Sequence, residues 1–402
     1  MFSSIVLPAQ NSTNSPYTRY GYGELGNRSF GAGRAMGGIG VGLRSSRQIN
    51  PMNPASYSSI DSMTFLFDFG ATFQTSVYKD GTNKQNDMNG NVDYMAMEFP
   101  LFKQMAMSAG LLPYSHVGYR FGENKTTIDG QRYTEVFEGI GGLNLLYAGL
   151  SIELWKKRLS IGSNINYLFG TISHVTRTDL LSSNSTTVTG STVYKLNDAI
   201  YDFGVQYVQP LSKTDQLIFG LTFTPEKKLK NDKYEMITNS SEVLIDDTVS
   251  NKRSDSPNSY GIGLSYVREH KFIAAVDFSF QEWSKASFLG EKDRFNNRVK
   301  AVAGFEIIPN LYSGHYITQV RCRAGLSYSN SYIKTMQGYG YKEYGVTIGA
   351  GFPISDERSF VNISLEYLKV KPDIKTMINE NYFKVTLSYT FNENWFFKLK
   401  IK

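Results

Sequence analysis

From about residue 63 to residue 391, apolar and polar residues alternate in one segment after another. In the last such segment, every second residue is apolar or aromatic and the residues between them are polar: Phe383, Val385, Leu387, Tyr389 and Phe391. Successive side chains of a strand point to opposite faces, so a period of two indicates strands with one apolar and one polar face. Few segments repeat with a helical period. The chain is therefore expected to be all-β.

The segments and their connections predict a closed, antiparallel transmembrane barrel of about 14 strands. The expected strands span residues 63–79, 91–101, 104–121, 132–154, 157–178, 191–211, 215–236, 257–269, 271–284, 296–308, 319–333, 342–354, 359–371 and 381–391. Long polar connections alternate with short ones, as they do where short periplasmic turns alternate with longer outer loops. Many strands exceed the ~10 residues that cross the hydrocarbon, so they are expected to project beyond the outer leaflet. A water-soluble β-sandwich is the alternative, but it requires no such parity.

Composition limits the other classes of protein. The mean hydropathy is -0.31 and no run of 18 apolar residues occurs, which excludes a transmembrane helix but not a barrel. Cys322 and four scattered histidines argue against a metal site, and no cofactor is expected. A net charge of +6 without a basic, aromatic-rich run argues against nucleic acid. The sequence contains no convincing catalytic arrangement, so an enzyme is the least favoured function.

The two ends of the chain are expected to lie outside the barrel wall. Residues 1–9 are interpreted as the remnant of a signal peptide, with a frayed start as the alternative. Residues 10–62 then form an N-terminal plug and residues 63–391 the barrel, whose last strand carries the apolar alternation that an assembly machine must recognise.

NEN at 392–394 resembles a turn, so residues 392–402 are expected to form a periplasmic tail with Trp395, Phe396 and Phe397 against the rim. The expected location is the outer membrane of a Gram-negative bacterium, in contact with lipid and lipopolysaccharide.

The segment GAGRAMGGIGVGLRSSRQINPMNPASY, residues 31–57, requires a separate explanation. Its glycine spacing is not the dinucleotide fingerprint, and no Gly-Lys-Ser/Thr follows, so it is not a Walker loop. A flexible linker remains an alternative, although Met36, Ile39, Val41 and Leu43 are unusual for one. A plug inside a barrel would explain both the glycines, which allow close approach to the wall, and the Asn-Pro pairs, which break regular structure. Its arginines Arg34, Arg44 and Arg47 are candidates to pair with inward acids such as Glu366 or Asp277.

These residues resemble the N-terminal hatch of the FadL/TodX family of outer-membrane transporters. The matching positions are Gly31, Gly33, Arg34, Gly37 and Gly38, followed by the Asn-Pro-Ala motif at Asn53, Pro54 and Ala55. Residues 141–170 and 343–354 are also similar to members of the family. The resemblance implies a 14-stranded barrel with a small N-terminal plug, in which a hydrophobic ligand enters the lumen from outside and leaves sideways through the wall.

A lateral exit needs an interrupted strand. Pro113 falls inside the third expected strand, where it removes a ladder donor, and the third strand is also where the family's wall is kinked. Pro113, with Tyr114 and His116, is therefore a lateral-gate candidate; the alternative is that the strand simply ends at Leu112. Trp283, which follows another strand, is expected to lie in an aromatic girdle.

Two functions are favoured over that of an outer-membrane enzyme. The first is a FadL-like channel for uptake of fatty-acid-like hydrophobic molecules. The second is a non-transporting FadL-like barrel that serves as a subunit or substrate shuttle of an outer-membrane secretion or assembly complex. An apolar, continuous lumen would favour transport, whereas a lumen sealed by charged plug contacts would favour the role as a subunit. The plug spans only about 50 residues before the first expected strand, which leaves little room for a ligand.

Overall fold

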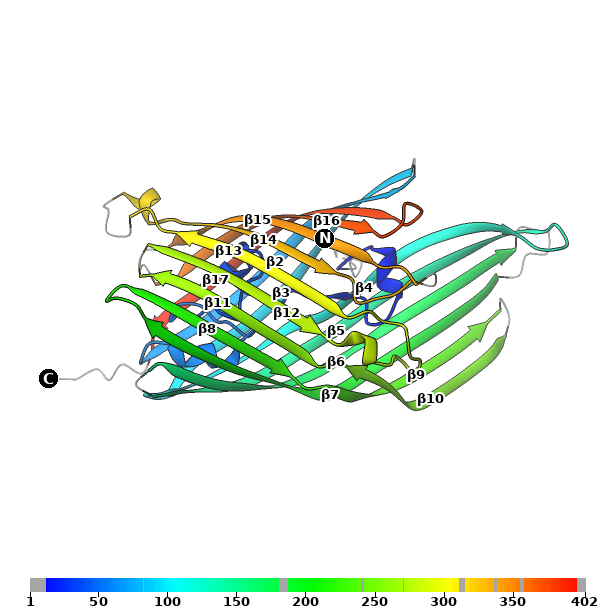
Figure 1. The fold of residues 1–402 in the computed structure, drawn as a ribbon. Helices are drawn as coiled ribbons and strands as arrows, with labels where there is room; N and C mark the ends of the chain where they lie inside the picture. The colour runs from blue at the N-terminus through cyan, green and yellow to red at the C-terminus, as the bar shows by residue number, and fades with distance from the viewer. Residues whose placement is uncertain are drawn as a thin grey trace, which may run out of the picture.

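The computed structural model describes residues 12–81, 83–155, 157–180, 187–239, 242–269, 271–310, 315–335, 338–354 and 358–395. Its wall is a single antiparallel sheet that closes into a barrel (Figure 1). The strands of the wall are β2 (Thr64–Asp80), β3 (Asn83–Phe102), β4 (Met105–Thr126), β5 (Arg132–Leu154), β6 (Leu159–Leu180), β7 (Thr187–Pro210), β8 (Asp215–Thr224), β9 (Lys227–Thr238), β10 (Val243–Ser256), β11 (Ser259–Arg268), β12 (Phe272–Gln281), β13 (Arg298–Ile307), β14 (Arg321–Asn330), β15 (Tyr341–Pro353), β16 (Phe360–Pro372) and β17 (Asn379–Asn394). β17 pairs with β2 along its whole length and so closes the ring.

Two wall strands are interrupted at the same level. Pro225 lies between β8 and β9, and Pro257 lies between β10 and β11. Proline has no N–H to donate, so it breaks a ladder locally. β8 pairs with β11 and β9 pairs with β10. The consecutive segments β8 and β9 therefore cross the wall as one strand, and β10 and β11 cross it as another. Counted in this way the barrel has 14 strands, which confirms the sequence prediction. β10 itself lies in a stretch that was expected to be a loop.

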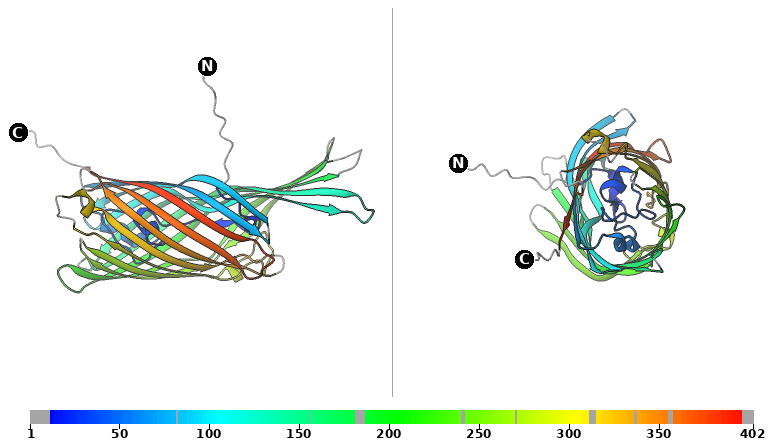
Figure 2. Two further views of the ribbon diagram at one scale, coloured as in Figure 1. Left: turned by 90° about the horizontal axis from the view of Figure 1, so that it is seen from above. Right: turned by 90° about the vertical axis from the view of Figure 1, so that its left-hand side faces the viewer.

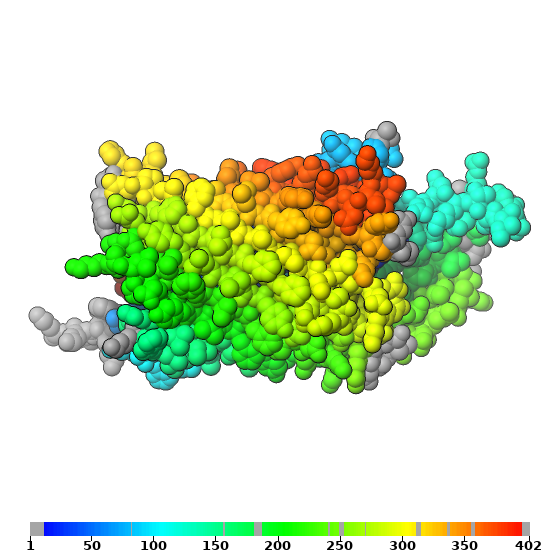
Figure 3. Space-filling model, viewed as in Figure 1, coloured from blue at the N-terminus to red at the C-terminus, as the bar shows by residue number. Residues whose placement is uncertain are grey.

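Several hairpins project beyond one end of the barrel. β5, β6 and β7 have 23, 22 and 24 residues, and the β4–β5 hairpin extends past the rest of the wall (Figure 3). The short turns lie at the opposite end, together with the end of β17 (Figure 1). We call these the long-loop end and the short-turn end.

The C-terminal strand is longer than expected. β17 continues to Asn394, so residues 392–394 pair with β2 instead of forming a turn. Trp395 then stacks on Phe65, with 4.5 Å between ring centroids, at the start of β2. The rest of the expected tail, including Phe396 and Phe397, and the expected signal remnant 1–9 lie outside the described residues.

The two faces of the wall differ as the alternation predicts. Large apolar side chains on the outer face include Ile165, Leu221, Ile262, Val346 and Phe383, which are 59%, 54%, 56%, 50% and 50% exposed respectively. Side chains between them point inward and are mostly small and polar, such as Ser160, Asn164, Asn362, Thr347 and Ser388. Within the part of the chain that the structure describes, no helix is long and apolar enough to cross a membrane.

Residues 12–62, which we call the lumenal segment, lie inside the barrel (Figure 2). Its short elements are η1 (Pro16–Arg19), β1 (Glu24–Leu25), α1 (Gly31–Ala35) and η2 (Pro54–Ser59). The segment contains buried apolar residues that pack on inward side chains of the wall, including Tyr22, Phe30, Met36, Ile39 and Tyr57. The barrel interior is therefore filled by the chain itself.

The wall is open between β3 and β4 toward the long-loop end. The ladder that joins these strands starts near the short-turn end, at Phe102↔Met105, and stops at Met95↔Leu111. Beyond this point β3 continues to pair only with β2 and β4 continues with β5. The described parts of the two strands thus present facing edges that are not paired with each other.

Candidate functional site

A β-bulge beside the wall opening turns two consecutive side chains of β3 into the lumen. Gly70 pairs with Tyr94 and Ala71 pairs with Val92, so Asp93 is the extra residue of the bulge. Asp93 and Tyr94 are both buried as a result. The Tyr94 hydroxyl accepts a hydrogen bond from the Gly31 N–H at 2.8 Å, and its ring stacks on Phe30 with 3.8 Å between centroids.

Arg34 of α1 forms an ion pair with Asp93, and both side chains are less than a tenth exposed. The guanidinium also donates to the carbonyls of Ser29 and Asn27 at 3.2 and 3.1 Å. Burial lowers the pKa of Arg34, but the charge of Asp93, together with Tyr94, Glu366 and the hydrogen bond to Asp93, offsets this, so the pKa is raised above its ordinary value. The expected pairing with Glu366 or Asp277 is wrong, because the bulge brings a nearer carboxylate inward.

Two more arginines of the lumenal segment reach acids on other strands. Arg28 forms an ion pair with Asp202 of β7 at 2.5 Å, and Arg44 forms one with Glu153 of β5 at 3.1 Å. Arg44 also donates to the carbonyl of Ala55 at 2.9 Å. Together with Arg34, these contacts fasten the segment to three separate parts of the wall.

Asp277 of β12 binds the backbone of the segment, not an arginine. Its two carboxylate oxygens accept hydrogen bonds from the N–H groups of Gly40, Val41 and Gly42 at 2.7, 2.8 and 3.1 Å. Consecutive backbone N–H groups make a concave anion-binding surface. The inward acid that the sequence singled out is therefore an anchor, but with a partner that the sequence did not suggest.

The Asn-Pro-Ala motif caps η2. The Asn53 side-chain oxygen Oδ1 accepts a hydrogen bond from the Ala55 N–H at 3.1 Å, and Pro54 occupies the first turn, where its missing N–H needs no partner. The Asn53 amide donates to the Val41 carbonyl at 2.8 Å, which ties η2 to the glycine-rich stretch. Asn53 and Ala55 are both fully buried.

Glycines on both the segment and the wall allow a close approach. Gly37 and Gly38 have φ angles of +82° and +93°, which side chains with a Cβ rarely adopt, and they end α1. On the wall, a Cβ at Gly304 or Gly325 would lie 2.4 or 2.2 Å from the Met36 backbone. Other inward wall glycines meet the segment in the same way: Gly162, Gly204, Gly220 and Gly263.

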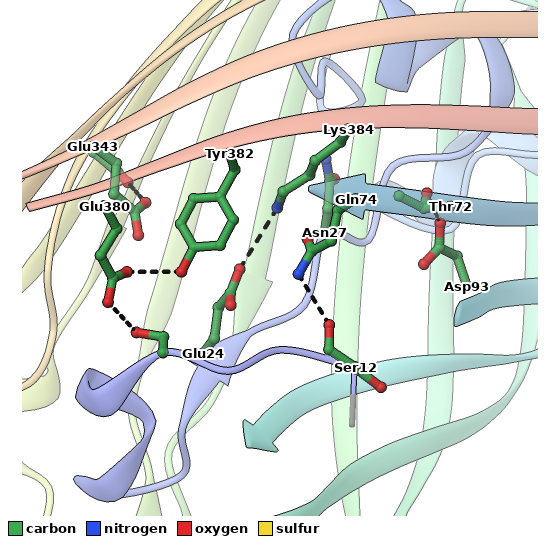
Figure 4. Close-up of polar contacts among 12 residues, drawn as sticks. Ser12, Glu24, Asn27, Thr72, Gln74, Asp93, Glu343, Glu380, Tyr382 and Lys384 are labelled. Atoms are coloured by element: carbon green, nitrogen blue, oxygen red, sulfur yellow. Dashed lines mark hydrogen bonds and ion pairs between the residues drawn. The ribbon is translucent and has the colours of Figure 1, made fainter. Parts of the chain in front are cut away.

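A cavity of about 130 Å³ lies between the lumenal segment and the wall. It is lined by charged and polar groups, several of which Figure 4 shows. Lys384 of β17 points to Glu24 of β1 at 3.6 Å, and Arg298 of β13 lies 3.3 Å from Glu343 of β15. The lining residues also include Lys300, which forms no ion pair within the described residues. Such a lining suits water or a polar group and not an apolar ligand.

The proposed gate residues lie at the wall opening. Tyr114 is the extra residue of a second bulge, because Pro113 pairs with Asn144 and Ser115 pairs with Leu143 of β5. Strand β4 continues through this bulge to Thr126, so the alternative that the strand ends at Leu112 is wrong. Pro113 and His116 both line the cavity, which reaches the opening between the two strand edges.

The lumenal segment covers part of the exposed β4 edge. In β1, Glu24 pairs with His116 and Leu25 pairs with Ser115, in antiparallel register. The Gly26 N–H donates to the Tyr114 carbonyl at 2.8 Å. On the β3 side, the Asn14 amide donates to the Asn89 side chain at 3.3 Å. Residues of the segment therefore occupy the part of the opening that is nearest to the end of the β3–β4 ladder.

Aromatic side chains fill the lumen toward the long-loop end. Tyr22 is fully buried, and its ring lies 5.6 Å from Trp283 and 5.0 Å from Phe288. Tyr332 donates its hydroxyl to the Gly23 carbonyl at 2.6 Å. Trp283 is only 1% exposed, so the expectation that it lies in an outer girdle is wrong. The chain after β12 folds inward and packs on the segment. Among the described residues, no cluster of His, Cys, Asp or Glu could hold a metal ion.

The fold defined by these features is that of the FadL-type channels. The toluene transporter TodX from Pseudomonas putida is 14% identical with a TM-score of 0.59, over 92% of this chain and 100% of that one. The toluene transporter TbuX from Ralstonia pickettii is 14% identical with a TM-score of 0.58, over 90% of this chain and 98% of that one. A FadL homologue from Pseudomonas aeruginosa gives 13% and 0.58, over 92% and 99%. At these identities the likeness is one of fold.

The chain belongs to the BamG family, whose family model matches residues 1–402. No curated protein sequence matches it. Two structures that share the fold, CymD and TbuX, are described as a monoaromatic hydrocarbon channel and a toluene transporter.

Proposed function

We propose that this protein is a subunit of an outer-membrane protein complex of a Gram-negative bacterium, built on a FadL-type barrel whose lumen is closed by its plug. The main support is the set of ion pairs that join the lumenal segment to the wall. Arg28, Arg34 and Arg44 each form an ion pair with a different strand of the wall. A charge removed from water is stable only while its partner stays in place, so these pairs hold the plug shut.

The cavity beside the plug lacks the apolar lining that a hydrophobic ligand needs. Binding pockets for such molecules are mainly apolar with few polar groups. The cavity beside the plug is instead lined by Glu24, Arg298, Lys300, Glu343 and Lys384, among other polar residues. The family match is in keeping with a role in a complex, and the outward apolar face would contact lipid and lipopolysaccharide.

Uptake of a hydrophobic compound with lateral exit is the second candidate, and the opening between β3 and β4 favours it. Pro113 and the bulge at Tyr114 stand at this opening, and the solved channels share the fold. The sequence alone favours this function. The charged cavity favours the role as a subunit instead, because a ligand would have to cross polar, occupied space to reach the opening.

Proteoliposomes distinguish the two functions. We expect this protein to take up labelled oleate and toluene no faster than protein-free liposomes do. The toluene transporter TodX, reconstituted in parallel, is the positive control. Saturable uptake by this protein that is faster than the protein-free background would favour the transport function and contradict the proposal.

A further inference from the structure

We infer that the unpaired edge of β4 toward the long-loop end, from Arg120 to Asn124, binds an extended, polar segment of a partner polypeptide as an added strand. This inference deepens the proposed function and rests on it, because it names the surface through which the barrel would join its complex. The proposed binding edge is separate from the place of lateral release of a small ligand, which would be the part of the opening near Pro113.

The backbone groups of this edge are free in the part of the chain that the structure describes. The Gly118 N–H donates to the Thr18 hydroxyl at 3.1 Å, and the same hydroxyl bonds to the Gly118 carbonyl at 3.1 Å. Both backbone groups of Gly118 therefore point into the opening. In an antiparallel strand the groups of every second residue point to the same side. Arg120, Gly122 and Asn124 consequently present their N–H and C=O groups to the opening, and all three residues are exposed.

A groove lies beside the start of this edge, at Arg120 and Phe121. It has a volume of about 570 Å³ and lies between the first residues of β3 and the part of β4 near the long-loop end. Lys84 and Asp87 line it from β3, Arg120 and Phe121 from β4, and Asn14 from the lumenal segment. The mixture of charges suits a polar polypeptide and not an acyl chain. The edge from Arg120 to Asn124 would hold about five residues at the rise of an extended strand.

The chain already uses the same edge for strand addition. β1 is antiparallel to β4 at Ser115 and His116, and Thr18 binds Gly118 between these residues and the free part. Recognition through an added strand depends on main-chain hydrogen bonds, and a partner would continue the ladder that β1 begins. Unpaired strand edges are usually covered or disrupted in native proteins, because they pair readily with other chains. Neither proline nor a covering element protects Arg120–Asn124 within the described residues.

Substitution of Gly122 separates this edge from the ladder on the other side of β4. In Gly122→Pro the edge loses one N–H, whereas the ladder with β5 uses the groups of Phe121, Glu123 and Lys125. Gly122→Ala keeps the N–H and is the matched control. A Cβ at this position would lie no closer than 3.4 Å to other atoms, so the Cβ that both changes add has room.

The test is residue-resolved amide hydrogen exchange on the full chain, extracted from its native outer membrane in mild detergent or refolded alone. We expect the amides of Arg120, Gly122 and Asn124 to exchange at least tenfold more slowly in the extracted protein than in the refolded protein. The slow exchange of Arg120 and Asn124 should be lost in Gly122→Pro and kept in Gly122→Ala. The amides of Phe121, Glu123 and Lys125 report that the barrel is folded.

Two outcomes would overturn the inference. Equal protection of the edge in the refolded protein would mean that this chain's own residues cover it. Free exchange of the edge in an extract that contains stoichiometric partner proteins would mean that the partner binds elsewhere, and the proposed function would stand without this surface. An extract with no partner protein would instead contradict the proposed function.

Discussion

Replacing Arg34 by methionine is expected to release the lumenal segment from the wall near the opening. The substitution leaves the Asp93 carboxylate buried without its cation, and breaking one partner of a buried ion pair costs about 3–5 kcal/mol. The carbonyls of Ser29 and Asn27 lose their donors as well. Because ~1.4 kcal/mol corresponds to a tenfold change, amides that exchange through detachment of the segment should exchange roughly 100- to 4,000-fold faster. Hydrogen exchange of residues 27–43 measures the effect.

The double variant Arg34→Met with Asp93→Asn is the control for this prediction. It removes both charges, so most of the lost stability of the segment should return. Amides of the β5–β6 ladder should be unchanged in both variants, because this ladder has no contact with Arg34. Unchanged exchange of residues 27–43 in the single variant would show that the ion pair does not hold the segment.

Asp277→Ala is expected to open the lumen from a second point. The change removes the acceptor of three N–H groups at once, from Gly40, Val41 and Gly42. Each buried donor left unpaired costs about 1–3 kcal/mol, so the total loss should be about 3 kcal/mol or more. In planar lipid bilayers we expect the wild-type barrel to be electrically silent and Asp277→Ala to show frequent openings to ion flow.

Asp277→Asn provides a graded control for this experiment. Its single carbonyl oxygen can still accept from Gly40 and Val41, which both bond to the same oxygen in the wild type. Only the Gly42 bond is lost, so openings should be rarer than in Asp277→Ala. Silent traces from Asp277→Ala would show that the glycine-rich stretch is held by other contacts.

The fold follows from the sequence because the wall obeys a simple period. Alternating segments predicted 14 strands, and the apolar faces of residues such as Phe383 and Leu387 do point outward. Pro113 marked the strand beside the opening for a physical reason that the structure bears out, since the ladder to β3 stops two residues before it. What these residues do during a functional cycle stays a prediction.

The partners inside the lumen could not be read from the same period. The bulge at Asp93 places two consecutive residues inside, which strict alternation forbids, so Arg34 was assigned to the wrong acids. Trp283 follows a strand end and was placed at the membrane boundary, but tertiary packing against Tyr22 buries it. The role of the wall glycines Gly304 and Gly325 appears only in the structure, where Met36 lies against them.

If this barrel works as part of a larger assembly with its lumen closed, it should stay bound to partner proteins when it is extracted gently. Mass spectrometry under non-denaturing conditions, on protein from native outer membrane, measures what stays bound. We expect the 45.2 kDa chain to be found with stoichiometric partner polypeptides and without a bound hydrophobic molecule. A solitary chain that carries a fatty acid or another apolar compound would rule out the role as a subunit and identify the protein as a transporter.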